Sequence, residues 1–165
     1  MKTLKRRRRE GKTDYLKRLK LLKSHAPRIV FRKTNKYVIS QYLSSKGIKD
    51  KVEIGVNSKQ LLKYGWPKEF EGSLKSIPAS YLVGLLMGRK IAKGKKETPI
   101  ADFGMIRNLH KTKIFAFLKG LVDAGIKMKY DKNTFPEDER VRGANLKKDF
   151  SEIFEKIKSE IENEK

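Results

Sequence analysis

Alternating apolar and polar residues predict strands in the first third of the chain. Two segments rich in strand-forming residues, 28–32 and 37–42, are separated by the polar stretch 33–36, which predicts a hairpin with a four-residue loop. A third strand is expected over 51–57, where apolar residues occupy every second position. Together these segments predict a three-stranded antiparallel sheet.

The predicted pairing gives this sheet two different faces. If Arg32 pairs with Tyr37, Phe31 lies opposite Val38, and period-two alternation sorts the side chains. The apolar face is expected to carry Ile29, Phe31 and Val38, with Val52, Ile54 and Val56 from the third strand. The other face is expected to carry Arg28, Arg32, Tyr37 and Gln41. Helices would cover the apolar face and leave the basic face for a partner.

Helical spacing of apolar residues predicts the remaining elements. Helices are expected over 14–24, 58–64, 79–93, 111–124 and 146–163, with Thr13, Ser58 and Ser76 as N-terminal caps. Strands are expected over 99–103 and 126–130, and loops over 65–75 and 135–145. Gly84 and Gly88 cost helix propensity, so close approach of another backbone is their expected reason. The order predicts a mixed α/β (α+β) fold, an open mixed sheet with helices on one face.

The chain is expected to divide into three parts. Residues 1–12 carry no periodic apolar pattern and predict a basic arm that is disordered until it binds a partner. Residues 13–145 form the mixed α/β domain, and 146–165 form a C-terminal amphipathic helix.

Charge narrows the possible functions. The 165 residues include 41 Lys and Arg but 19 Asp and Glu, a formal net charge of +22. Residues 1–33 hold 14 of the basic residues against Glu10 and Asp14 alone. Such self-repulsion makes a freely circulating metabolic enzyme a poor interpretation and predicts binding to a polyanion, above all nucleic acid.

Several other classes are disfavoured. With no cysteine, the chain has no disulfide and no thiolate zinc site. The start lacks the apolar region of a secretory signal, and no apolar run is long enough to span a membrane, so a cytoplasmic protein is expected. His25 and His110 have no metal-ligand spacing, and no cofactor is expected. Glu53, Asp102 and Asp123 leave open a metal-dependent nuclease, although no motif links them.

The basic segments fit RNA better than DNA. The arm and first helix offer many phosphate partners, which give affinity without sequence information. The hairpin mixes a stacking ring with hydrogen-bonding side chains, which suits unstacked RNA, although Tyr37 could equally be a strand filler. No DNA-reading motif is present. A general nucleic-acid chaperone remains the alternative.

Four stretches resemble one protein family. They are RRRREGKTDY at 6–15, PRIVFRKTN at 27–35 with Gln41, IPASYLVGLLMGRK at 77–90, and FAFLKGLVDAG at 115–125. The chain is similar to the archaeal type of the large-subunit ribosomal protein L-eighteen family, called L-five in eukaryotes. Two stretches depart from the family pattern: 106–113 is poor in glycine, and 135–143 is less basic than an RNA clamp.

The resemblance implies a structural, non-enzymatic protein of the large ribosomal subunit. It implies binding to 5S ribosomal RNA, docking of that RNA onto the large-subunit (23S-type) RNA in the central protuberance, and a neighbour of the bacterial L-five family. It also implies a core similar to ribonuclease-H-like and S-eleven folds, and no homo-oligomer.

The expected RNA contacts combine the matched motifs with the basic segments. The motifs supply Arg6, Arg7, Arg8, Arg9, Lys12, Tyr15, Arg28, Arg32, Thr34, Asn35 and Gln41. The basic segments and the hairpin add Arg18, Tyr37, Arg107, Lys111, Arg140 and Arg142. Arg89 and Lys90 are also expected contacts, although cations at a helix C-terminus equally favour its dipole.

Overall fold

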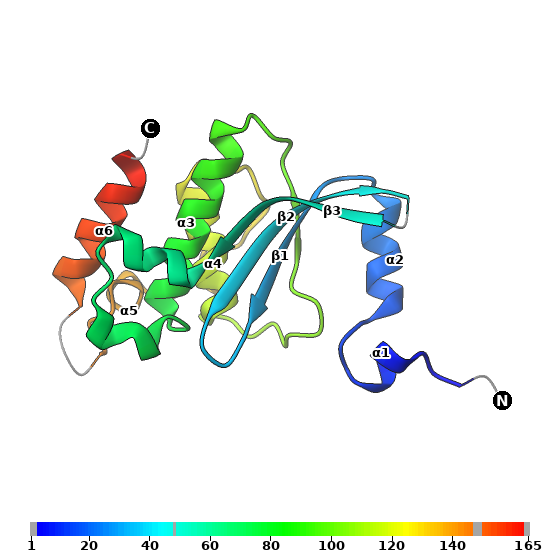
Figure 1. Ribbon diagram of the computed structural model, residues 1–165, viewed down its shortest axis with the longest axis horizontal. Helices are drawn as coiled ribbons and strands as arrows, with labels where there is room; N and C mark the ends of the chain where they lie inside the picture. The colour runs from blue at the N-terminus through cyan, green and yellow to red at the C-terminus, as the bar shows by residue number, and fades with distance from the viewer. Residues whose placement is uncertain (1–2, 48, 147–149, 164–165) are drawn as a thin grey trace.

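A four-stranded sheet forms the centre of the computed structural model, which describes residues 3–47, 49–146 and 150–163. The strands are β1 Arg28–Lys33, β2 Val38–Lys46, β3 Lys49–Asn57 and β4 Ile100–Asp102. Their order is β3-β2-β1-β4, with β4 parallel to β1 and the other neighbours antiparallel (Figure 1). The open mixed sheet confirms the predicted α/β class.

Helices lie on both sides of this sheet. The α-helices are α1 Arg6–Arg9, α2 Tyr15–Lys23, α3 Ile77–Lys93, α4 Lys113–Asp123, α5 Asp138–Arg142 and α6 Ser151–Asn163. Short 3-10 helices are η1 Ser58–Tyr64, η2 Lys68–Ser73 and η3 Lys132–Thr134. α3 packs against α4, α6 and the strands, whereas α1 and α2 lie on the opposite side of the sheet (Figure 1). The prediction of helices on one face therefore holds for α3 to α6 and is wrong for α2.

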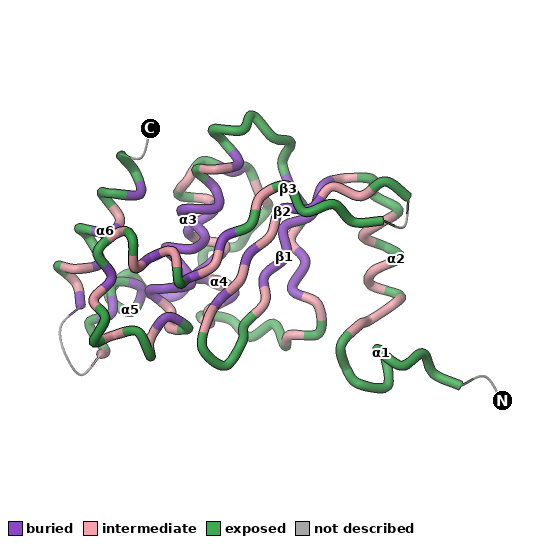
Figure 2. The backbone as a smooth tube through the Cα atoms, in the orientation of Figure 1, coloured by how far each residue is buried: buried purple, intermediate pink, exposed green. Residues whose placement is uncertain are grey.

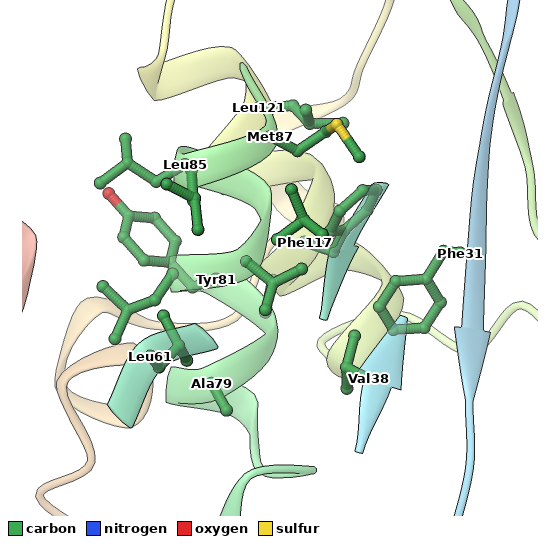
Figure 3. Packing of buried hydrophobic residues seen from close by; sticks show 14 of the residues in the cluster. Phe31, Val38, Leu61, Ala79, Tyr81, Leu85, Met87, Phe117 and Leu121 are labelled. Atoms are coloured by element: carbon green, nitrogen blue, oxygen red, sulfur yellow. The ribbon is translucent and has the colours of Figure 1, made fainter. Parts of the chain in front are cut away.

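The core lies between the sheet and α3. All residues of α3 from Pro78 to Gly88 are buried, and purple runs along this helix in Figure 2, whereas α1 and α2 have no buried residue. Figure 3 shows Met87 of α3 beside Leu121 of α4, with Phe31 and Val38 approaching from the strands.

Glycines set the distance between α3 and α4. A Cβ built on Gly84 would lie 2.2 Å from the carbonyl oxygen of Phe117, and one on Gly120 would lie 2.2 Å from that of Tyr81. A Cβ on Gly88 would lie 2.4 Å from the Cβ of Ala124. The predicted close approach at Gly84 and Gly88 is confirmed.

The hairpin register differs from the prediction by two residues. Arg32 pairs with Ile39 rather than Tyr37. The cause is the turn, in which Tyr37 N–H donates to Thr34 Oγ1 at 2.9 Å and Thr34 N–H donates to the Tyr37 carbonyl at 2.8 Å. A shift by an even number of residues keeps each side chain on its face, so the prediction that Ile29, Phe31 and Val38 are buried still holds.

A β-bulge changes the third strand. Tyr42 pairs with Ile54 while Leu43 pairs with Val52, which leaves Glu53 as an extra residue on β3. One extra residue moves the following side chain to the other face. Val52 is consequently 49 % exposed, and its predicted inward position is wrong, whereas Val56 is buried.

Two helix caps differ by one residue from the predicted ones, Asp14 lying one residue after Thr13 and Asn57 one residue before Ser58. The carboxylate of Asp14, not Thr13, accepts the backbone N–H groups of Leu16 and Lys17. The side chain of Asn57, not Ser58, accepts from Lys59 N–H. The Ser58 hydroxyl is fully buried and accepts from Val38 N–H at 3.0 Å, so it links η1 to the sheet. Ser76 caps α3 as predicted.

Four expectations about local structure are corrected. Residues 126–130 form no strand. The loop expected over 65–75 contains η2, and the loop expected over 135–145 contains α5. Trp66, in the first of these segments, is buried against Phe150, with the two ring centroids 4.6 Å apart. The arm contains α1, although its side chains are exposed. The C-terminal helix is described from Ser151, and 147–149 lie outside the described residues.

Candidate nucleic-acid interface

The N-terminal segment presents its cations to solvent. α1 consists of Arg6, Arg7, Arg8 and Arg9, and all of its residues are exposed. Glu10 pairs with Arg6 at 3.6 Å and with Lys12 at 2.9 Å. Exposed ion pairs of this kind contribute little free energy, so phosphate oxygens can replace the carboxylate at small cost.

The same segment is joined to α2 by short-range contacts. Arg7 Nε donates to Thr13 Oγ1 at 3.0 Å, and Arg8 pairs with Asp14 at 3.6 Å. Tyr15 is half-buried, and the ammonium group of Lys5 lies 4.6 Å from the centre of its ring. These contacts hold the arginine side chains near the start of α2.

Arg28 does not lie on an open basic face. Its side chain is 1 % exposed, and its guanidinium contacts Asp50 at 2.6 Å and Asp102 at 3.4 Å. Its Nη2 also donates to Ser45 Oγ at 3.2 Å. The predicted exposure of Arg28 is wrong, because carboxylates from β3 and β4, distant in the sequence, enclose the guanidinium.

Two further arginines, both partly exposed, join these residues in what we call the Arg28 cluster. Arg18 of α2 pairs with Asp50 at 2.8 Å, and Arg32 pairs with Asp102 at 3.5 Å. Arg32 Nη1 also donates to the backbone carbonyl of Asp102 at 2.9 Å. The Arg32 side chain is nevertheless 43 % exposed. The cluster connects α2 to β1, β3 and β4, and Arg32 and Arg18 remain accessible to a partner.

The Arg28 cluster should make stability depend on pH. Burial alone would raise the pKa of Asp50, but hydrogen bonds from Ser45, Arg18 and Arg28 outweigh it and lower that pKa. A carboxylate whose pKa is lowered in the folded state stabilises that state at every pH above its pKa in the unfolded chain, which is about 3.9. This stabilisation is lost as the pH falls from there through the lowered pKa. We expect the urea midpoint to fall as the pH drops below about 4, and Asp50→Asn to lower the midpoint at pH 7 and flatten this acid limb. An unchanged acid limb in the variant would contradict the assignment.

The hairpin tip supplies few free side-chain groups. The Thr34 hydroxyl is used within the turn, while Asn35 is exposed and its carbonyl accepts from Lys75 at 2.8 Å. Tyr37 is half-buried and packs against the core, as the strand-filler alternative expects. Gln41 is half-buried and pairs with Val30 of β1. Of this group, Asn35 is the most open to a ligand.

The remaining predicted residues lie away from the arm. Arg89 is exposed near the end of α3, and Lys90 donates to Gln60 Oε1 at 3.5 Å. Around α4 and α5, Arg107 and Arg140 are exposed, Lys111 pairs with Glu137 at 2.9 Å, and Arg142 pairs with Glu155 at 3.3 Å.

The structure brings four of the predicted residues together. Arg7, Lys12, Arg18 and Arg32 line a polar hollow of about 120 Å³ between α2 and the sheet. Sequence reasoning missed Lys17, which lines the same hollow and donates to the Gly104 carbonyl at 3.3 Å. Its place in the basic run 17–23 was the available signal.

The carboxylates of the nuclease alternative do not converge. Asp102 belongs to the Arg28 cluster, Asp123 accepts from the Tyr81 hydroxyl at 2.7 Å, and Glu53 pairs with Lys96 at 2.8 Å. Among the residues that the structure describes, no group of three or more His, Asp or Glu side chains could hold a metal ion. None of the described helices is long and apolar enough to cross a membrane.

Comparison with known proteins gives both a matching family and named relatives. Residues 1–101 match the family described as "Ribosomal large subunit proteins 60S L5, and 50S L18". The chain is 44 % identical over 141 residues to large ribosomal subunit protein uL18 of Korarchaeum cryptofilum, an alignment that covers 86 % of this chain and 70 % of the relative. It is 39 % identical to the protein of that name from Methanoregula boonei and 41 % identical to that from Methanoculleus marisnigri. These alignments cover 86 % of this chain and 79 % and 78 % of the relatives.

Proposed function

Because the chain belongs to this family of large-subunit ribosomal proteins, and is therefore a structural constituent of the ribosome rather than an enzyme, we propose that its RNA partner is 5S ribosomal RNA. In this proposal the protein attaches 5S RNA to the large-subunit RNA in the central protuberance, beside a protein of the bacterial L-five family. The observation that carries the proposal is the exposed arginine helix α1, which lies on the far side of the sheet from the core (Figure 1).

The proposed interface has two parts with different roles. The N-terminal segment supplies phosphate contacts, because its guanidinium groups are exposed and each can bind two phosphate oxygens. Arg18 and Arg32 supply the preference for one RNA over another. Their ion pairs in the Arg28 cluster hold Arg18 on α2 and Arg32 on β1 at fixed positions, so they can contact only an RNA of matching shape. Arg28 itself acts as a positioning residue, since its buried side chain holds the carboxylates that orient both neighbours.

A competition titration tests this proposal. Labelled 5S RNA bound to the full-length protein is challenged with excess transfer RNA at about 0.05 and 0.3 M salt. A binder that uses charge alone and neutralises six to ten phosphates should lose roughly 10³-fold or more in affinity over this range. We expect 5S RNA to resist displacement by the excess transfer RNA at both salt concentrations.

The same titration with Arg32→Gln examines the sheet contribution. We expect a loss of roughly five- to tenfold in the preference for 5S over transfer RNA, the effect of one charged contact of about 1 kcal/mol. Lys63→Gln, which removes one exposed charge elsewhere, is the matched control. Free displacement of 5S RNA by transfer RNA in the unmodified protein would instead favour a general nucleic-acid chaperone.

A further inference from the structure

A second hollow, which we call the β1–α4 pocket, lies between the end of β1 and the start of α4. It has a volume of about 480 Å³, within the range of small-ligand sites. Its apolar lining comes from Phe31 of β1, Ile77 of α3, Ile106 of the loop after β4 and Ile114 of α4. These residues come from four separate segments, so the folded core shapes the pocket.

Cations form the rim of this pocket. Lys33, Arg107, Lys111, Lys113 and Arg140 line it, and none of its described lining residues is Asp or Glu. On the rim, the ammonium group of Lys111 pairs with the Glu137 carboxylate at 2.9 Å. Burial, and after it the charges of Lys33 and Lys75, lower the pKa of Lys113. The pocket therefore combines an apolar floor with a rim of positive charges. These charges repel one another, and a bound anion would relieve that repulsion.

The first turn of α4 adds to this positive potential. Thr112 begins the helix without a side-chain cap, because its hydroxyl donates to the Leu109 carbonyl at 2.7 Å. Thr112, Lys113 and Ile114 all line the pocket. The N-terminal end of a helix carries partial positive charge, so dipole and side chains favour the same kind of ligand.

We propose that the β1–α4 pocket takes one unstacked nucleotide of ribosomal RNA, with its base against the isoleucine floor and its phosphates on the cationic rim. The proposal rests on the proposed function in that the partner is RNA, and it adds a place where a single base is held. A base removed from its stack offers an apolar face next to an anionic backbone. That combination matches the floor and the rim together, whereas the bases of a paired duplex stay stacked and keep their flat faces from the floor.

Methyl NMR of the full-length protein tests the pocket directly. Isoleucine methyl groups are labelled, and the protein is titrated with five-nucleotide single-stranded RNAs and with a short fully paired RNA duplex. We expect the Ile77 and Ile106 methyl signals to move upfield and to saturate with the single strands, because a base over the floor adds a ring current. The paired control is a blunt-ended duplex of two complementary strands, which has no unpaired loop, and it should leave these signals in place.

Charge-matched variants connect the signals to the rim. We expect Arg107→Gln with Lys113→Gln to weaken pentanucleotide binding roughly tenfold, the effect of losing two partly exposed charged contacts. Lys63→Gln with Lys127→Gln removes the same charge elsewhere and should leave the affinity within about twofold.

The outcomes separate this proposal from the proposed function. Unmoved isoleucine signals, with 5S RNA still bound in the competition titration, would overturn the pocket alone. Signals that move with an oligoglutamate peptide but not with RNA would make the pocket a protein-docking site. Pentanucleotide binding at the pocket, together with free displacement of 5S RNA, would retain the pocket and remove the 5S assignment.

Discussion

Replacement of Gly84 by alanine is expected to lower the free energy of unfolding by about 3 kcal/mol or more. The added Cβ would lie 2.2 Å from the backbone carbonyl oxygen of Phe117. Backbone cannot move aside like a flexible side chain, so α3 and α4 must separate and lose contacts between buried residues. Urea unfolding at neutral pH measures the loss.

Gly55→Ala is the matched control for this prediction. Gly55 lies in β3, and a Cβ built there meets no atom within 4 Å. We expect its unfolding free energy to change by less than about 0.5 kcal/mol or to rise, since alanine reduces the freedom of the unfolded chain. Equal effects of the two substitutions would show that α3 and α4 separate easily, contrary to the packing described.

Conversion of Arg6, Arg7, Arg8 and Arg9 to glutamine is expected to weaken RNA binding by about 10²- to 10³-fold at 0.15 M salt. Each phosphate contact contributes roughly 0.7 to 0.9 to the slope of log affinity against log salt, so this slope should decrease by about 3. Filter binding or fluorescence anisotropy across a salt series measures both quantities.

The control removes four charges from other exposed positions. Lys63, Lys68, Lys127 and Lys129 are exposed and lie outside the N-terminal segment. Their replacement by glutamine changes the net charge equally, and we expect less than about a tenfold loss of affinity. A loss equal to that of the arginine variant would mean that total charge, not the position of α1, determines binding.

The arrangement of strands and helices was accessible from the sequence because it depends on short periodic patterns. Alternation at 28–32 and 51–57 and the cap at Ser76 led to the correct elements. The register of β1 on β2 was missed because the Thr34 hydroxyl, a single side chain, closes the turn. Val52 was misplaced because a bulge at Glu53 leaves no mark on an alternating pattern.

The candidate site was harder to derive because its partners are distant in the sequence. The exposed cations of the arm followed from composition, since a dense basic run cannot bury its side chains. The burial of Arg28 could not be inferred, because Asp50 and Asp102 stand 22 and 74 residues away. Likewise, Ile77, Ile106 and Lys113 form one pocket only after α3, β4 and α4 have packed together.

The Arg28 cluster also has a consequence for the order in which the chain is made. Arg28 leaves the ribosome long before Asp102, which follows it by 74 residues. A buried cation that lacks one of its carboxylates is destabilising, so we expect the β1–β2–β3 meander of a nascent chain to be less stable until β4 has been synthesised. We therefore expect the basic N-terminal segment to be exposed before its sheet is complete, in the period when a newly made polycation most needs an RNA or a chaperone to shield it.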